Sequence, residues 1–166
     1  MADHEAIKKL ATALVSELTA AGQSVATAES CTGGWVAKAI TDVPGSSACF
    51  GYGIVCYSNG AKESMLGVQI QTLVDNGSVS EPVVREMATG ALNLSGAHIG
   101  VAVSGVAGPG GGSDEKPVGT VWFAWAIRDG NKVRLDTGVQ HFDGDRELVR
   151  ELTVVHALQG VLDRLD

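Results

Sequence analysis

The sequence predicts an α/β fold in which a mixed sheet carries helices on both faces. Helical and strand patterns alternate early in the chain, and a hairpin ends the series of strands. The chain has 166 residues, of which 45% are hydrophobic, and this is enough to bury one core. We therefore expect a single domain over residues 1–166.

The first part of the chain is predicted to form a helix, a strand, a second helix and a second strand. Residues 4–21 have apolar side chains at helical spacing, and Gly22 ends the pattern. Residues 24–28 are compatible with a short strand, and residues 35–41 have a helical pattern. Residues 49–57 are rich in large apolar side chains and predict a buried strand.

The middle of the chain is predicted to be mainly helical. Ser58 is a favourable N-cap for a short helix, and residues 70–74 predict another. Residues 80–94 predict a longer helix that ends before Gly96. Residues 99–103 then predict a buried strand.

The last part of the chain is predicted to form a hairpin and a closing helix. Residues 118–127 and 133–142 have strand patterns, and the turn residues Asp129-Gly130-Asn131 join them. Residues 145–165 predict an amphipathic helix. The aromatic side chains of the hairpin are interpreted as core and sheet packing. They are Trp122, Phe123 and Trp125.

Composition and charge narrow the class of protein. The formal net charge is −7 and the sequence pI is about 5.0, which disfavours nucleic acid and anionic membranes but allows a small anionic ligand. The three cysteines form no zinc or redox motif, so we expect no metal. No signal peptide or membrane-spanning run is evident, and these features together predict a cytoplasmic protein.

Ser30 is the first candidate for chemistry. It lies where a predicted strand turns into a helix, shortly before Gly33 and Gly34. Such a junction exposes a hydroxyl beside unpaired N–H groups, which are suited to stabilise an oxyanion. The same pattern is typical of a serine that only caps its helix, and caps far outnumber nucleophiles. Spacing alone therefore favours the cap.

A serine nucleophile needs a base, and Lys62 is the candidate. The four histidines form no recognisable triad, and only His141 near Asp143 is worth testing. Ser–Lys pairs perform the same chemistry. Lys62 begins a helix after an apolar strand, where loss of water would lower its pKa toward neutrality. Taken alone, a lysine is usually a solvated surface residue.

A glycine-rich loop over residues 104–113 is the third candidate feature. It follows a buried strand, where open α/β sheets bind ligands, and its N–H groups can approach a phosphate. Ser104 and Lys116 would add contacts to this phosphate. The loop matches neither the P-loop nor the dinucleotide-binding pattern, so a plain flexible loop remains an even alternative. Arg146 is a candidate phosphate clamp, although a surface charge is its default interpretation.

Taken together, these segments resemble the CinA carboxy-terminal domain family, whose stand-alone members are nicotinamide-nucleotide amidases. Several matching strings occur in order over nearly the whole chain, which is far more specific than any one of them. They are Ala26-Thr27-Ala28-Glu29-Ser30-Cys31-Thr32-Gly33-Gly34, Tyr57-Ser58-Asn59 with Lys62, Val79-Ser80-Glu81, Ser104-Gly105-Val106-Ala107-Gly108-Pro109 and Lys116-Pro117-Val118-Gly119-Thr120-Val121. Gly60 departs from the acidic residue expected there, which weakens local helix propensity but touches no candidate catalytic group. The family's molybdopterin-binding-like domain is not matched, so the expected form is the short amidase.

The resemblance implies a three-layer α/β/α sandwich around a mixed, roughly five-stranded sheet with extra terminal helices. It also implies hydrolysis of nicotinamide mononucleotide to nicotinate mononucleotide and ammonia in pyridine nucleotide recycling, without a cofactor, by a homodimer. Ser30 would be the nucleophile and Lys62 the general base. Backbone N–H groups of the turn would hold the oxyanion, and further residues would bind the substrate. The oxyanion donors expected are Cys31, Thr32, Gly33 and Gly34, and the binding residues are Tyr57, Ser104, Gly105, Gly108 and Arg146.

Two alternatives stay open at this level. The first is a non-catalytic module that senses a nucleotide or binds a protein, linked to competence or DNA damage. It would keep the glycine-rich loop but would have no use for a paired Ser30 and Lys62. The second is an amidase for another amide, which a substrate panel with and without the 5′-phosphate would reveal.

Overall fold

A computed structural model of the chain describes residues 3–165. Its helices and strands alternate as the sequence predicts. In chain order they are α1 (His4–Ala21), β1 (Val25–Glu29), α2 (Trp35–Thr41), the 3-10 helix η1 (Ser46–Ala48), β2 (Phe50–Val55), α3 (Asn59–Leu66), α4 (Ile70–Asn76), α5 (Glu81–Ser95), β3 (Ile99–Gly105), β4 (Thr120–Asp129), β5 (Lys132–His141) and α6 (Arg146–Leu162).

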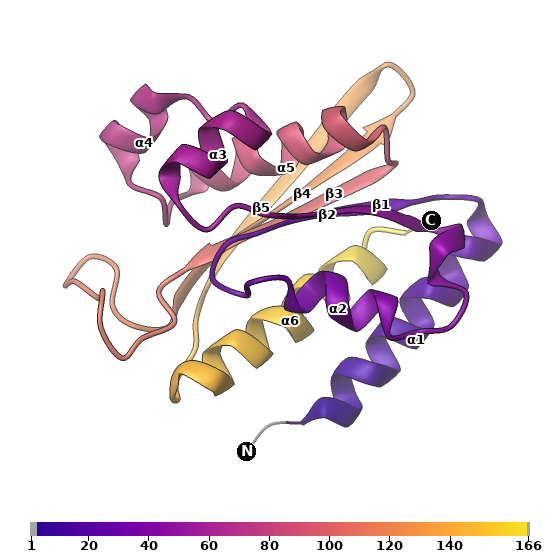
Figure 1. The fold of residues 1–166 in the computed structure, drawn as a ribbon, viewed down its shortest axis with the longest axis horizontal. Coiled ribbons are helices and arrows are strands. Elements are labelled where there is room, and N and C mark those ends of the chain that lie inside the picture. Colours follow the sequence, from indigo (N-terminus) through magenta and orange to yellow (C-terminus); the bar gives the residue numbers. More distant parts are fainter. Residues whose placement is uncertain (1–2, 166) are drawn as a thin grey trace.

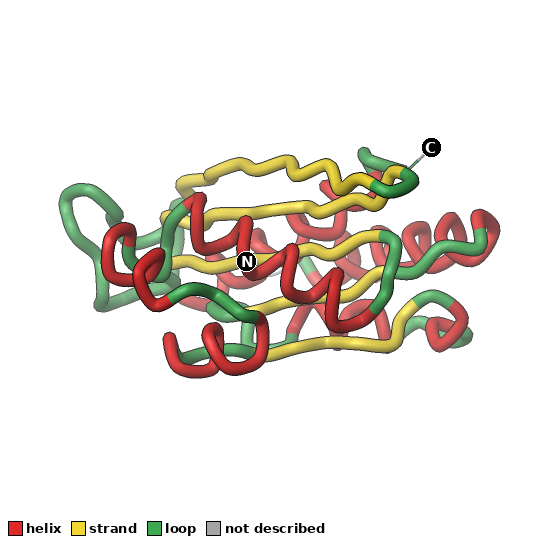
Figure 2. Tube along the Cα trace, turned by 90° about the horizontal axis from the view of Figure 1, so that it is seen from above, coloured by secondary structure: helices red, strands yellow, loops and turns green. Residues whose placement is uncertain are grey.

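The five strands form one mixed sheet in the order β2-β1-β3-β4-β5 (Figure 2). β1 pairs in parallel with β2 and with β3, whereas β4 pairs antiparallel with β3 and β5. The three parallel strands therefore end at the same edge of the sheet, where open α/β sheets bind ligands.

Helices cover both faces of the sheet, which confirms the three-layer α/β/α prediction. Figure 1 shows α1, α2 and α6 on one face and α3, α4 and α5 on the other. Alternate residues of the central strands contribute to two separate hydrophobic cores, because successive side chains of a strand point to opposite faces of the sheet. Phe123 and Trp125 join the α1–α2–α6 core, and Ala102 and Ala124 join the α5 core.

Trp125 shows how closely a helix packs on the sheet. A Cβ built at Gly160 of α6 would lie 2.2 Å from the Trp125 ring, so only glycine fits at that point of contact. Phe123 and Trp125 are 0% and 2% exposed, and Trp122 packs against the opposite core. The interpretation of these aromatic residues as packing groups is thus confirmed.

The prediction of a buried strand over residues 49–57 was wrong. The strand exists as β2, but it is the edge of the sheet, and Tyr52 and Val55 are 47% and 44% exposed. An edge strand has a neighbour on one side only, so its apolar residues need not be covered. Within residues 3–165, none of the helices combines the length and the apolar character that crossing a membrane requires.

Candidate active site

Ser30 lies directly after β1, at the carboxyl end of the parallel strands. Its N–H donates to the Val103 carbonyl of β3, which fixes its backbone to the sheet. Gly34, rather than Ser30, occupies the N-cap position of α2. The helix-cap interpretation of Ser30 is therefore wrong, and its hydroxyl is available for another contact.

That contact is with Lys62, on the first turn of α3. Lys62 Nζ lies 2.9 Å from Ser30 Oγ, although the two residues are 32 positions apart in the sequence. The pairing follows from the register of the sheet, because Glu29 of β1 lies opposite Val55 of β2 and the Cys56 N–H donates to the Glu29 carbonyl. The start of α3 is thereby brought over the end of β1.

The Lys62 side chain is buried, with 1% of the residue exposed. Its Nζ donates to the carbonyl oxygens of Cys56 and Tyr57, at 3.0 and 3.4 Å. No carboxylate among residues 3–165 lies within ion-pair distance of it. Burial disfavours the charged amine and lowers the pKa of Lys62 below its ordinary value of 10.5.

A cavity of about 220 Å³ opens beside the Ser30–Lys62 pair. Seven of the residues predicted for the site line it, namely Ser30, Cys31, Tyr57, Lys62, Ser104, Gly105 and Arg146. Ser78 and Ala107 also line it, although sequence reasoning missed both. The one signal for Ser78 was its place directly before the family string Val79-Ser80-Glu81.

On the far side of this cavity, Arg146 links two segments of the chain. Its Nη1 donates to the Gly108 carbonyl at 2.8 Å, and its Nη2 donates to the Tyr57 hydroxyl at 3.3 Å. Gly108 itself does not line the cavity but positions the guanidinium. Arg146 thus joins the glycine-rich loop to the segment after β2.

Two other polar side chains of this region are already engaged. The Ser104 hydroxyl donates to the Ser78 carbonyl at 2.8 Å. Lys116 Nζ donates to the Asn76 carbonyl at 2.6 Å, so it fastens the glycine-rich loop to the end of α4 and is not among the cavity residues. The predicted phosphate contact from Lys116 is not supported by this geometry.

The predicted oxyanion donors divide into two groups. Cys31 lines the cavity with Ser30, whereas Thr32, Gly33 and Gly34 line a separate cavity beside Trp35 and Arg150. The Gly33 N–H is also occupied, because it donates to the Ser30 carbonyl at 3.1 Å. Of the four predicted donors, Cys31 is the one that lines the Ser30 cavity.

The Cys31 thiol is not an alternative nucleophile at neutral pH. Burial raises the pKa of Cys31 to about 12, so the reactive thiolate is scarcely populated. Within residues 3–165, no group of three or more His, Cys, Asp and Glu side chains is placed to hold a metal ion. The chemistry available in the cavity is that of a serine hydroxyl beside an amine.

Comparison with known proteins identifies the family. Residues 7–165 match the model of the CinA C-terminal domain. The chain is 54% identical over 159 residues to the nicotinamide-nucleotide amidohydrolase PncC of Escherichia coli, covering 96% of this chain and 94% of that protein. It is also 54% identical over 156 residues to PncC of Pseudomonas putida, covering 94% and 95% of the two chains.

A solved structure agrees with these matches. The competence/damage inducible protein CihA of Agrobacterium tumefaciens is 46% identical and superimposes with a TM-score of 0.89, over 95% of this chain and 94% of that one. The shared fold, the ordered sequence motifs and the near-complete coverage lead to one conclusion. The chain belongs to the CinA C-terminal domain family.

Proposed function

We propose that this protein hydrolyses the carboxamide of nicotinamide mononucleotide, giving nicotinate mononucleotide and ammonia, and so acts in pyridine nucleotide recycling. The observation that carries the proposal is the 2.9 Å contact between the buried Lys62 amine and the Ser30 hydroxyl. The names of relatives that are 54% identical over nearly the whole chain supply the substrate.

Lys62 Nζ donates to Ser30 Oγ and to the carbonyl oxygens of Cys56 and Tyr57. A neutral amine has two N–H donors and one lone pair, whereas an ammonium has three donors and cannot accept a proton. We propose that in the active form the neutral amine keeps its N–H contacts with the Cys56 and Tyr57 carbonyls and turns its lone pair toward the Ser30 O–H. Lys62 is therefore proposed as the general base.

Acylation begins when Lys62 takes the Ser30 proton and Oγ attacks the carboxamide carbon. The carbonyl electron pair moves to oxygen, where the Cys31 N–H is proposed to stabilise it. One well-placed donor of this kind contributes about 3 kcal/mol to such a transition state. As the C–N bond breaks, protonated Lys62 gives its proton to the departing nitrogen and ammonia leaves.

Deacylation repeats the same steps with water. Lys62 removes a proton from water, the hydroxide attacks the ester formed on Ser30, and the proton returns to Oγ as the acid leaves. Arg146 and Tyr57, at the far side of the cavity, are proposed to bind the phosphate end and orient the amide. Over one cycle water and the amide are consumed, ammonia and the acid are released, and Ser30 and Lys62 return to their starting states. The proposed steps therefore need no cofactor.

The test is ammonia release from nicotinamide mononucleotide by the purified protein. Ser30→Ala should abolish turnover while the circular dichroism spectrum and melting temperature stay near those of the wild type. Near-normal turnover by Ser30→Ala would refute the nucleophile. Binding of the nucleotide by the wild type without ammonia release would favour the non-catalytic alternative.

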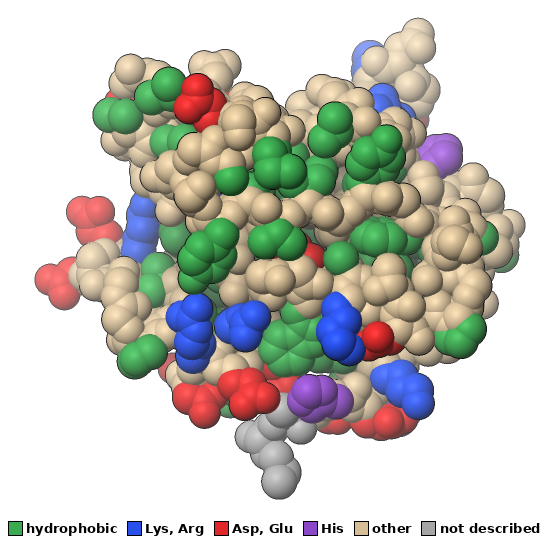
Figure 3. Space-filling model, in the orientation of Figure 1, with side chains coloured by type: hydrophobic (Ala, Val, Ile, Leu, Met, Phe, Trp, Pro, Cys, Tyr) green, Lys and Arg blue, Asp and Glu red, His purple; other side chains and the backbone are tan. Residues whose placement is uncertain are grey.

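We also propose that the protein is a cytoplasmic homodimer. The three free cysteines suit a reducing compartment. The unpaired edge of β2 presents exposed Tyr52 and Val55 and is the surface proposed for a second copy. In the view of Figure 3, hydrophobic side chains spread across the middle of the molecule. Light scattering should give twice the chain mass of 17.1 kDa, and a mass of 17.1 kDa would refute the dimer.

A further inference from the structure

The turn over residues 30–34 is held by two charged side chains that do not line the Ser30 cavity. Glu29 comes from the end of β1 and Arg150 from near the start of α6. We propose that both are positioning residues, which hold this turn so that the Cys31 N–H meets the oxyanion. The inference rests on the proposed function, because it assigns a task to residues around the same nucleophile.

Glu29 fastens the turn to the helix that follows it. Its buried carboxylate accepts hydrogen bonds from the Thr32 hydroxyl at 2.5 Å and from the N–H groups of Val36 and Ala37 at 2.8 and 3.0 Å. Hydrogen bonds to an ionised acceptor are stronger than neutral ones. The end of β1, the side chain of Thr32 and the first turn of α2 are therefore joined at one carboxylate.

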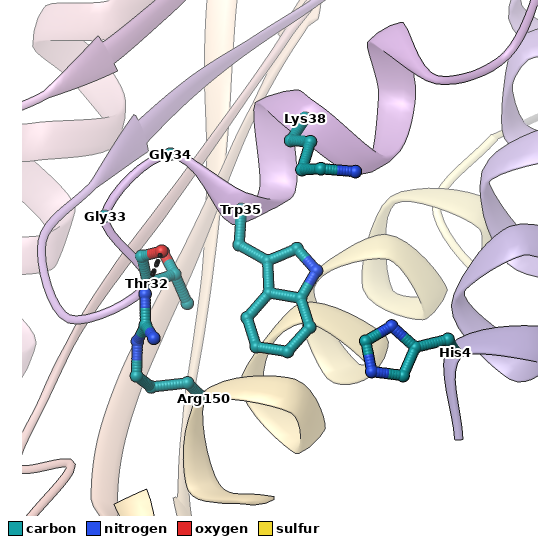
Figure 4. Close-up of a pocket in the computed structure, with 7 residues that line it drawn as sticks. All are labelled: His4, Thr32, Gly33, Gly34, Trp35, Lys38 and Arg150. Atoms are coloured by element: carbon teal, nitrogen blue, oxygen red, sulfur yellow. Dashed lines mark hydrogen bonds between the residues drawn. The ribbon is translucent and has the colours of Figure 1, made fainter. Parts of the chain in front are cut away.

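Arg150 holds the carbonyl groups of the same turn. Its Nε donates to the Cys31 carbonyl at 3.0 Å, and its Nη2 donates to the Thr32 carbonyl at 3.1 Å. The guanidinium carbon lies 5.6 Å from the centre of the Trp35 ring, and Figure 4 shows the side chain reaching Thr32 beside that ring. Within residues 3–165 no carboxylate pairs with Arg150, so these backbone groups are its principal partners.

A hydrogen bond that holds a carbonyl group in place also orients the N–H group of the same peptide. A trans peptide is planar, and its C=O and N–H point in opposite directions. The bond from the Gly33 N–H holds the Ser30 carbonyl, and therefore orients the Cys31 N–H of the same peptide. Arg150 holds the next two peptides, which are followed by Gly33 and Gly34 at φ values of +60° and +100°.

The two glycines explain why an outside restraint is needed. Glycine has no Cβ and rotates through conformations closed to other residues, so residues 33–34 do not by themselves hold the turn in one shape. Loss of the Arg150 guanidinium would remove the side-chain partner of the Cys31 carbonyl and leave the Thr32 carbonyl with the Trp35 N–H, which donates to it at 3.1 Å. The Cys31 N–H would then occupy its oxyanion-binding direction for a smaller part of the time.

The test is the variant Arg150→Ala with Arg164→Ala as matched control. Arg164 also stacks on a tryptophan, 4.0 Å from Trp125, and also donates to a backbone carbonyl, that of Gly160. Arg164 is absent from the lining of the Ser30 cavity. Arg150→Ala should lower kcat for nicotinamide mononucleotide by about 10- to 100-fold with KM within about twofold, because a small misplacement at the reacting groups is costly.

Two further measurements separate positioning from folding. Guanidinium ion added to Arg150→Ala should restore part of kcat, and Arg150→Lys should lie between the wild type and Arg150→Ala, since an ammonium cannot reproduce both contacts. The melting temperature of Arg150→Ala should be no lower than that of Arg164→Ala. An unchanged kcat, or an equal loss of kcat in Arg164→Ala, would overturn the proposal.

A second readout keeps this inference separate from the proposed substrate. A fluorophosphonate labels an activated serine as its oxygen bonds to phosphorus, fluoride leaves, and the base takes the proton. Wild-type protein that releases no ammonia would refute the proposed function, yet the labelling rate of Ser30 would still report on the turn. Slower labelling in Arg150→Ala than in Arg164→Ala supports positioning by Arg150, and equal rates overturn it.

Discussion

The proposed phosphate contact of Arg146 can be tested by changing the enzyme and the substrate together. The variant is Arg146→Ala, and the second substrate is nicotinamide riboside, which has the same amide but no 5′-phosphate. If Arg146 binds the phosphate, the variant should lose efficiency on the mononucleotide and little on the riboside. The amide chemistry at Ser30 is common to both substrates and cancels in the comparison.

The magnitude follows from the contacts and the exposure of the guanidinium. Arg146 uses one N–H for the Gly108 carbonyl and one for the Tyr57 hydroxyl, and an arginine has five, so donors remain for an anion. A hydrogen bond to a charged group contributes about 1.5–3 kcal/mol, which corresponds to roughly 10- to 150-fold. Arg146 is exposed, and solvent screens the interaction, so we expect a loss near the lower end of this range.

The assay measures kcat/KM for ammonia release from both substrates with both proteins. The expected result is about a tenfold loss for the mononucleotide, mostly in KM, with a loss of less than about threefold for the riboside. Equal losses on the two substrates would mean that Arg146 acts through Gly108 and Tyr57 on the shape of the cavity. That outcome would refute its role as a phosphate ligand.

The remaining predictions concern the base. Neutral Lys62 is the proposed active form, and burial lowers its pKa. We therefore expect kcat/KM to rise with pH and then level off, with the midpoint of the rise below pH 10.5. A midpoint at or above pH 10.5 would contradict this. Lys62→Met should change the pH dependence of stability. Between the lowered pKa and 10.5 the unfolded wild type binds a proton that the folded protein lacks, so its stability rises with pH, and Lys62→Met should lose that component. Urea unfolding at several pH values measures the difference, and identical slopes in the two proteins would argue against a lowered pKa.

Local signals in the sequence were sufficient for most helices and strands. Residues 35–41 form the helix predicted for them, and Ser58 is the N-cap of α3 as expected, with its side chain accepting a hydrogen bond from the Ala61 N–H. Gly96 ends α5 in the left-handed conformation that glycine favours at this position. Such signals act over a few residues and do not depend on how the elements pack.

Features that depend on the order of the strands in the sheet could not be predicted from local sequence signals. Residues 50–55 contain apolar side chains typical of a buried strand, but only the position of β2 at the edge of the sheet decides that Tyr52 is exposed. Ser78 enters the cavity next to Ser104, which donates to its carbonyl across 26 positions of sequence. No spacing rule connects those two residues.

The Ser30–Lys62 pair lies between these cases. Each residue alone favoured an ordinary interpretation, a helix cap or a solvated surface charge. The need of a serine nucleophile for a base suggested the pair, and the resemblance to a family supported it. Their contact depends on the parallel register that places the end of β2 beside the end of β1. Local spacing could identify both side chains as candidates, but the pairing is a property of the sheet.

Glu29 connects the geometry of the turn with the protonation of the base. It is the residue before Ser30, and a free carboxylate beside the Lys62 amine would favour the ammonium form and raise its pKa. Its oxygens are instead taken up by the Thr32 hydroxyl and by two N–H groups of α2, and it forms no ion pair with Lys62. Burial then remains the largest influence on the amine and lowers its pKa. Glu29 is therefore tied into the turn and forms no ion pair that would favour the ammonium form of the proposed base.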